Sequence, residues 1–171
     1  MKINRFEDLE CWQEARKLVA MVYRSIKSDK AFQSDYRLRD QSTGAAISIM
    51  NNISEGWASQ SNADFIRFLT YSRRSCAEVQ NCFYVALDQE YVNENTHEEA
   101  YEQAKRVIYD YRRFIKILTI SGAQRKWPPK TDQIVLTNRM VLTDLRSNDL
   151  NGLNDPNELN DLNDPNELNE P

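Results

Sequence analysis

The chain has 171 residues, of which 40% are hydrophobic and 28% charged, so it is long enough for one ordinary globular domain with a core. Residues 1–127 carry 19 Lys/Arg and 17 Asp/Glu, whereas residues 128–171 carry 3 Lys/Arg and 9 Asp/Glu. The net charge of −4 therefore comes from the C-terminal part and does not exclude an anionic partner for the rest of the chain.

Residues 4–121 contain no proline, as long helices require, because an interior proline costs about 3 kcal/mol. A first helix is predicted over residues 4–27, with Asn4 and Glu7 as a capping box. Its apolar stripe comprises Leu9, Trp12, Ala15, Val19, Val22 or Tyr23, and Ile26. Residues 28–32 are expected to form a connector.

A second helix is predicted over residues 35–57, and its small side chains suit close approach to a neighbouring helix. Gly44 is expected to serve that packing, and Gly56 to end the helix in the left-handed conformation. The stripe comprises Leu38, Gln41, Ala45, Ile49, Asn52 or Ile53, and Gly56. A third helix over residues 61–89 begins with a Ser61–Asp64 cap. It carries a heptad seam of Phe65, Leu69, Ser72, Cys76, Val79, Phe83 and Leu87.

A fourth helix is predicted over residues 96–121, with Thr96 and Glu99 as its capping box. Its stripe comprises Tyr101, Ala104, Ile108, Tyr111, Ile115 and Leu118. Four amphipathic helices with short connectors predict an all-α fold, an antiparallel up-and-down four-helix bundle over residues 1–126. A surplus of apolar residues favours burial between subunits over an irregular bundle: Ile47, Met50, Ile66, Tyr84, Val107, Phe114 and Ile117.

Residues 127–147 follow a Trp-Pro-Pro stop and contain two small apolar clusters, which leaves a linker, a short fifth helix, an extended arm or a docking segment open. Residues 148–171 contain a nine-residue repeat of Asn, Asp, Glu, Leu and Pro, for which we expect a disordered acidic tail. The repeat lacks the glycine-rich turns of calcium-binding β-rolls. No apolar run is long enough to span a membrane, and the three cysteines favour reduced thiols in the cytoplasm.

The second helix carries the most distinctive pattern, QSTGAAISIMNNISEG over residues 41–56. With Phe6-Glu-Asp-Leu9 before it and Ser75-Cys-Ala-Glu78 after it, this segment resembles the bacterial 23S ribosomal-RNA intervening-sequence protein family. The resemblance covers about residues 5–120. That family is related to the accessory variability determinant of diversity-generating retroelements.

The resemblance implies a homopentameric ring of four-helix bundles. It also implies RNA or DNA, and a reverse transcriptase, as partners. The motif residues of this chain are Gln41, Asn52, Glu55 and Gly56. Relatives commonly carry two basic residues after the glutamine, where this chain has Ser42, Thr43 and Gly44, so the residues that such a binding mode would use are missing.

Catalytic and metal-binding patterns are weak. His97 is the only histidine and lies among Glu98 and Glu99, with no second histidine to share a metal. Cys76 and Cys82 are six residues apart, so they do not lie on one helical face as a ligand pair. We therefore expect no enzyme activity, no cofactor and no metal.

Basic residues repeat along the third and fourth helices with aromatic residues between them. Such a pattern can contact successive phosphates, although a solvated face paired with acidic residues is the alternative. The candidate nucleic-acid-binding residues are Arg67, Arg73, Arg74, Lys105, Arg106, Arg112, Arg113 and Lys116. Two further hypotheses are a protein-interaction scaffold without nucleic-acid affinity, and an acidic tail that shields the basic faces.

Overall fold

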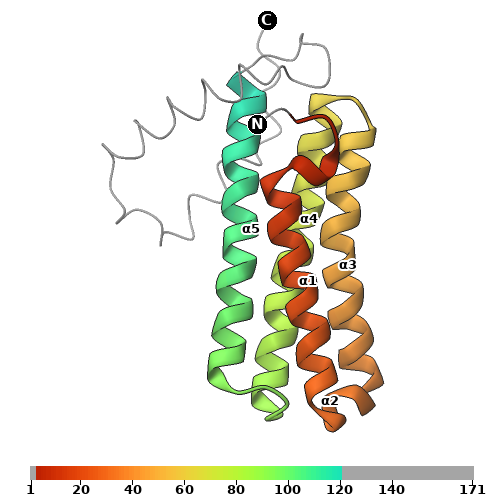
Figure 1. Cartoon of the computed structure of the whole chain (residues 1–171), viewed down its shortest axis with the longest axis vertical. Helices are drawn as coiled ribbons and strands as arrows, with labels where there is room; N and C mark the ends of the chain where they lie inside the picture. The colour runs from red at the N-terminus through yellow and green to blue at the C-terminus, as the bar shows by residue number, and fades with distance from the viewer. Residues whose placement is uncertain (1–2, 121–171) are drawn as a thin grey trace, which may run out of the picture. The chain divides into compact units, whose positions relative to one another are not determined.

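The computed structural model describes the backbone of residues 3–120 and the side chains of residues 3–115. These residues form a short 3-10 turn, η1 (Phe6–Asp8), and five helices: α1 (Glu10–Ser28), α2 (Lys30–Ser34), α3 (Tyr36–Ala58), α4 (Asn62–Asp88) and α5 (Glu94–Ile120). The four long helices alternate in direction and pack in a closed cycle, α1 on α3, α3 on α4, α4 on α5 and α5 on α1 (Figure 1). The predicted all-α, up-and-down four-helix bundle is thus confirmed. Residues 127–147 and 148–171 lie outside the described part, and no described helix is long and apolar enough to cross a membrane.

The N-terminal predictions need two corrections. The Asn4–Glu7 capping box does not form, because the Asn4 backbone N–H donates to the Asp8 carboxylate at 3.0 Å and α1 begins only at Glu10. Leu9 lies between η1 and α1, where its backbone is extended and its side chain is buried. The expected connector at residues 28–32 is partly the helix α2, capped by Asp29, whose carboxylate accepts from the Phe32 N–H at 2.7 Å.

Glycine has a different role in α3 from the one predicted. Gly56 does not end the helix, which continues to Ala58, and Gln60 takes the left-handed conformation instead with φ 55°. A Cβ on Gly56 would lie 2.5 Å from Phe65 Cδ2, so glycine is needed there for the close approach of α3 and α4. Gly44, expected to serve close packing, is exposed, and a Cβ there would meet no atom within 4 Å.

Two predicted caps have opposite outcomes. Ser61 caps α4 as predicted, since its hydroxyl accepts from the Asp64 N–H at 3.3 Å. The Thr96–Glu99 box is wrong, because α5 begins at Glu94 and the Asn93 side chain accepts from the Thr96 N–H at 2.9 Å. The helix cap therefore lies three residues, nearly one turn, earlier than the sequence indicated.

The core confirms the α4 seam and, except for Gln41, the α3 stripe, and it corrects parts of the α1 and α5 stripes. All predicted α4 seam residues are buried except Leu87, which is partly buried. In α5 the buried set is shifted and comprises Ala100, Gln103, Ala104, Val107, Tyr111 and Phe114. In α1 the buried set includes Cys11 and Leu18, while Trp12 and Val19 are only partly buried.

The apolar surplus is smaller than predicted. Val107 and Phe114 belong to the core, and Met50 and Ile66 pack against it. Ile47 and Tyr84 do remain exposed, at 41% and 49%. The side chain of Ile117 lies outside the described residues.

A buried polar chain ties three helices together. The Ser72 hydroxyl on α4 donates its proton to the Ile49 carbonyl of α3 at 2.8 Å. The Ser72 oxygen also lies 2.5 Å from the Tyr111 hydroxyl of α5. Because a hydroxyl has only one proton to donate, Tyr111 is the donor in this second bond. All three cysteines are free and buried. Burial raises the pKa of the Cys76 thiol to about 12, so this thiol stays protonated and is a poor nucleophile.

Candidate nucleic-acid interface

The antiparallel packing of α4 and α5 brings their basic halves together. Side-chain contacts pair Phe65 with Phe114, Ser72 with Tyr111, and Tyr84 with His97. The stretch 67–74 of α4 therefore lies beside the C-terminal half of α5 (Figure 1). Five candidate residues of these two helices lie outside the core, and we call this set the basic face: Arg67, Arg73, Arg74, Lys105 and Arg112.

Three arginines of the basic face have no acidic partner among residues 3–115. Arg74 and Arg112 are exposed and Arg73 is half-buried, and none of them forms an ion pair within the described part of the chain. The Arg74 guanidinium lies 5.8 Å from the ring centroid of Tyr71, which is itself 40% exposed. The basic face thus offers both unpaired cations and an accessible aromatic ring.

The other two cations are held loosely. Arg67 pairs with Asp64 at 2.9 Å and Lys105 with Glu102 at 2.7 Å, each three residues apart on the same exposed helix surface. Such surface pairs contribute roughly 0–1 kcal/mol, so a phosphate can displace the carboxylate. The Glu102 hydrogen bond raises the pKa of Lys105, which keeps this lysine charged at neutral pH.

Arg106 and Arg113 do not join the basic face, although the sequence grouped them with it. Arg113 pairs with Glu10 of α1 at 3.3 Å, and Arg106 donates to Gln103, whose amide in turn donates to Glu14 of α1 at 2.8 Å. Both arginines therefore belong to the seam between α1 and α5. The side chain of Lys116 lies outside the described residues.

Asp110 lies in this α1–α5 seam. Its burial, followed by repulsion from Glu10, raises the pKa of its carboxyl to about 6. Arg113 and Lys17 act in the opposite direction. The seam is thus a mixed-charge contact between helices and offers no surplus of positive charge to a phosphate.

The opposite half of the α4–α5 pair is acidic and aromatic. Asp88, Glu90, Glu94 and Glu98 gather where α4 ends and α5 begins. His97 is half-buried there rather than solvated: its ring lies 4.5 Å from Tyr84 and 5.9 Å from Tyr101 between centroids. The acidic residues therefore gather at one end of the α4–α5 pair, whereas Arg67, Arg73, Arg74 and Arg112 lie toward the other end.

The motif residues of α3 have mainly local roles. The Asn52 amide donates to the Ser48 carbonyl of the preceding turn at 2.8 Å, and Glu55 is exposed. Gly56 serves the α3–α4 contact. Gln41, expected within the buried stripe, is exposed and lines a cavity, where its side chain has no hydrogen-bond partner among the described residues.

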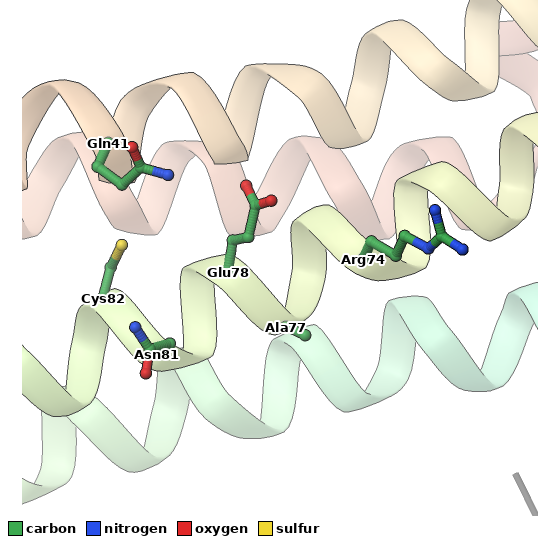
Figure 2. Close-up of a pocket in the computed structure, with 6 residues that line it drawn as sticks. All are labelled: Gln41, Arg74, Ala77, Glu78, Asn81 and Cys82. Carbon is green, nitrogen blue, oxygen red and sulfur yellow. The ribbon is translucent and has the colours of Figure 1, made fainter.

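That cavity, of about 380 Å³, is open to solvent and lies along α4 beside Gln41 of α3, and it went unnoticed in the sequence because its lining comes from two helices. It is lined by Gln41, Arg74, Ala77, Glu78, Asn81 and Cys82 (Figure 2). Glu78 and Cys82 project from α4 toward α3, where Gln41 faces them. No group of three or more His, Cys, Asp or Glu side chains in residues 3–115 is arranged to hold a metal ion.

Comparison with known proteins places the fold in context. The family model described as 23S rRNA-intervening sequence protein matches residues 7–110, more than half of the chain. A crystal structure from Bacteroides thetaiotaomicron VPI-5482, described as a protein with unknown function from the S23 ribosomal protein family, is similar over 62% of this chain and 98% of its own, with 19% identity and a TM-score of 0.55. No curated protein matches the chain. At that identity the structural similarity supports the bundle alone.

Proposed function

Because the chain belongs to the 23S rRNA-intervening sequence protein family, we propose that it is a non-enzymatic, cytoplasmic nucleic-acid-binding protein that engages phosphates through the basic face. The observation that supports the proposal is the set of arginines Arg73, Arg74 and Arg112, which lie on the adjacent helices α4 and α5 and form no ion pair among the described residues. Arg67 and Arg74 are seven residues apart, which separates them by about 10 Å along the helix. Cations at such intervals can follow a phosphate backbone.

Salt dependence tests this proposal directly. Each phosphate that the basic face neutralises releases condensed counterions, with a slope of about −0.7 in log K against log salt for a single strand. We expect fluorescence anisotropy to show binding of single-stranded RNA or DNA at about 50 mM salt and a steep loss of affinity as salt rises. Absence of binding at the lower concentration would contradict the proposal.

The assembly we propose is a homopentameric ring, in which the basic face is repeated in every subunit and the local field adds. Exposed Ile47 on α3 is consistent with some burial between subunits. Native mass spectrometry of the full chain should give a mass of five times 20.0 kDa. A monomer at micromolar concentration would contradict the ring.

An accessory role beside a retroelement reverse transcriptase is the more specific form of the proposal. A reverse transcriptase gene with template repeats next to this gene would support that role. A location inside a ribosomal-RNA gene would instead favour an RNA-associated role without the enzyme.

The acidic, aromatic half of the α4–α5 pair favours a second candidate function, an oligomeric protein-interaction scaffold without nucleic-acid affinity. Tyr84 and Val85 are exposed there beside Asp88, a combination suited to a protein surface and repulsive to phosphate. A protein partner that stays bound after nuclease treatment and after charge reversal of Arg73 and Arg112 would favour this function.

A further inference from the structure

We propose that the α3–α4 cavity is a base-binding pocket of the nucleic-acid interface, and that it selects an unpaired guanine through the carboxylate of Glu78. This inference rests on the proposed function. It assigns a role to Gln41, Glu78 and Asn81, which the phosphate contacts leave unused.

The cavity adjoins the basic face through one shared residue. Arg74 lines the cavity and also belongs to the basic face, and in Figure 2 its guanidinium extends away from the cavity along α4. A strand whose phosphates contact Arg67 and Arg74 therefore passes the mouth of the cavity. Its bases are then within reach of the space between α3 and α4.

The size and surfaces of the cavity suit a flat ring. Its volume of about 380 Å³ falls in the range of small-ligand sites, roughly 300–1,000 Å³. Ala77 and Cys82 give it apolar surface, while Tyr71, three residues before Arg74 on α4, offers an exposed ring on which a neighbouring base can stack. Bases in single strands are recognised in this way, by stacking combined with hydrogen bonds to their edges.

The polar groups of the cavity are available to a ligand. The side chains of Gln41, Glu78 and Asn81 are exposed and make no hydrogen bond or ion pair with any other described residue. Glu78 is an acceptor with two oxygens, and the amides of Gln41 and Asn81 each offer donors and an acceptor. The set thus combines one anionic acceptor with two adaptable amides.

Guanine is the base that matches this set. Its Watson–Crick edge presents two adjacent N–H donors, which a carboxylate can accept together, next to a carbonyl oxygen that an amide N–H can donate to. Cytosine offers a carboxylate only its amino group, and uracil and adenine each present a donor beside acceptors that Glu78 would repel. A bidentate contact of this kind discriminates between bases by roughly tenfold or more.

The test compares short labelled oligouridylates that carry a single central guanosine, adenosine, cytidine or uridine, measured by fluorescence anisotropy at about 50 mM salt. We expect the full chain to bind the guanosine strand about tenfold more tightly than the others. In Glu78→Gln this preference should disappear, while the affinity for the all-uridine strand stays the same or rises because a negative charge is removed. Glu98→Gln, the same charge change on exposed α5 surface, should keep the preference.

The outcomes separate this inference from the proposed function. Equal affinity for all four strands, a preference for another base, or a guanosine preference that survives Glu78→Gln would overturn the pocket and leave phosphate binding intact. A chain that binds none of the strands would overturn both.

Discussion

Asp110 shows how a single side chain makes the stability of the fold depend on pH. Its pKa of about 6 lies above the value of 3.8 expected for a free side chain, so the folded state holds the proton more tightly than the unfolded state does. The resulting stabilisation is complete below about pH 4 and is lost as the pH rises through about 6. Asp110→Asn should therefore be more stable than the parent at pH 7 and lose its advantage at pH 4. Urea unfolding of both proteins at the two pH values measures this, and an equal stability difference at both would be contrary to it.

Tyr111 carries the bond that joins α5 to α4 and α3. Without the Tyr111 hydroxyl, the buried Ser72 oxygen no longer accepts a hydrogen bond from α5, which lowers the free energy of unfolding by about 1 kcal/mol. We expect Tyr111→Phe to lower the free energy of unfolding by that amount in chemical denaturation. Tyr109→Phe, at an exposed tyrosine two residues earlier on α5, should leave stability unchanged. Equal effects of the two substitutions would show that the buried bond contributes nothing.

At the scale of the helices, two glycines of α3 provide opposite predictions. Gly56→Ala places a methyl group 2.5 Å from Phe65 Cδ2 and 2.8 Å from Phe68 Cβ, so it should destabilise the bundle by about 1–3 kcal/mol. Gly44→Ala meets no atom within 4 Å and should stabilise the helix by about 0.5–1 kcal/mol. Thermal unfolding of the two variants checks both signs, and a stabilised Gly56→Ala would refute the close α3–α4 contact.

The helices themselves could be predicted from local sequence, but their orientation in the core could not always be. The α4 seam has one continuous apolar face, so its spacing identified Phe65 and Phe83 as core residues. In α5, two different sets of apolar residues fit a spacing of three and four. The buried set is at positions 104, 107, 111 and 114, and the predicted set is at positions 101, 104, 108, 111 and 115. Only packing against α1 and α4 chooses between these sets, and it buries Val107 and Phe114.

At the scale of the whole bundle, the same limit applies to the site. Sequence located the basic residues correctly on two helices, because charge and spacing are local properties. It wrongly grouped Arg106 and Arg113 with the others, because their partners come from the packing of α1 on α5. Glu10 of α1 pairs with Arg113, and Glu14 of α1 accepts from Gln103, which in turn accepts from Arg106. The cavity beside Gln41 required α3 and α4 to be placed side by side. The sequence alone therefore predicted the cations and their helices, but neither the α1–α5 seam nor the groove beside Gln41.

The most direct test of the basic face is the affinity of a double charge reversal, Arg73→Glu with Arg112→Glu, for single-stranded RNA at about 50 mM salt. Its matched control is Arg24→Glu with Arg37→Glu, two exposed arginines on α1 and α3 that form no ion pair among the described residues. We predict that the first variant loses affinity by at least about tenfold and that its salt dependence flattens, while the control stays close to the parent. An equal loss in both variants, or no loss in the first, would contradict a nucleic-acid interface on the outer side of α4 and α5.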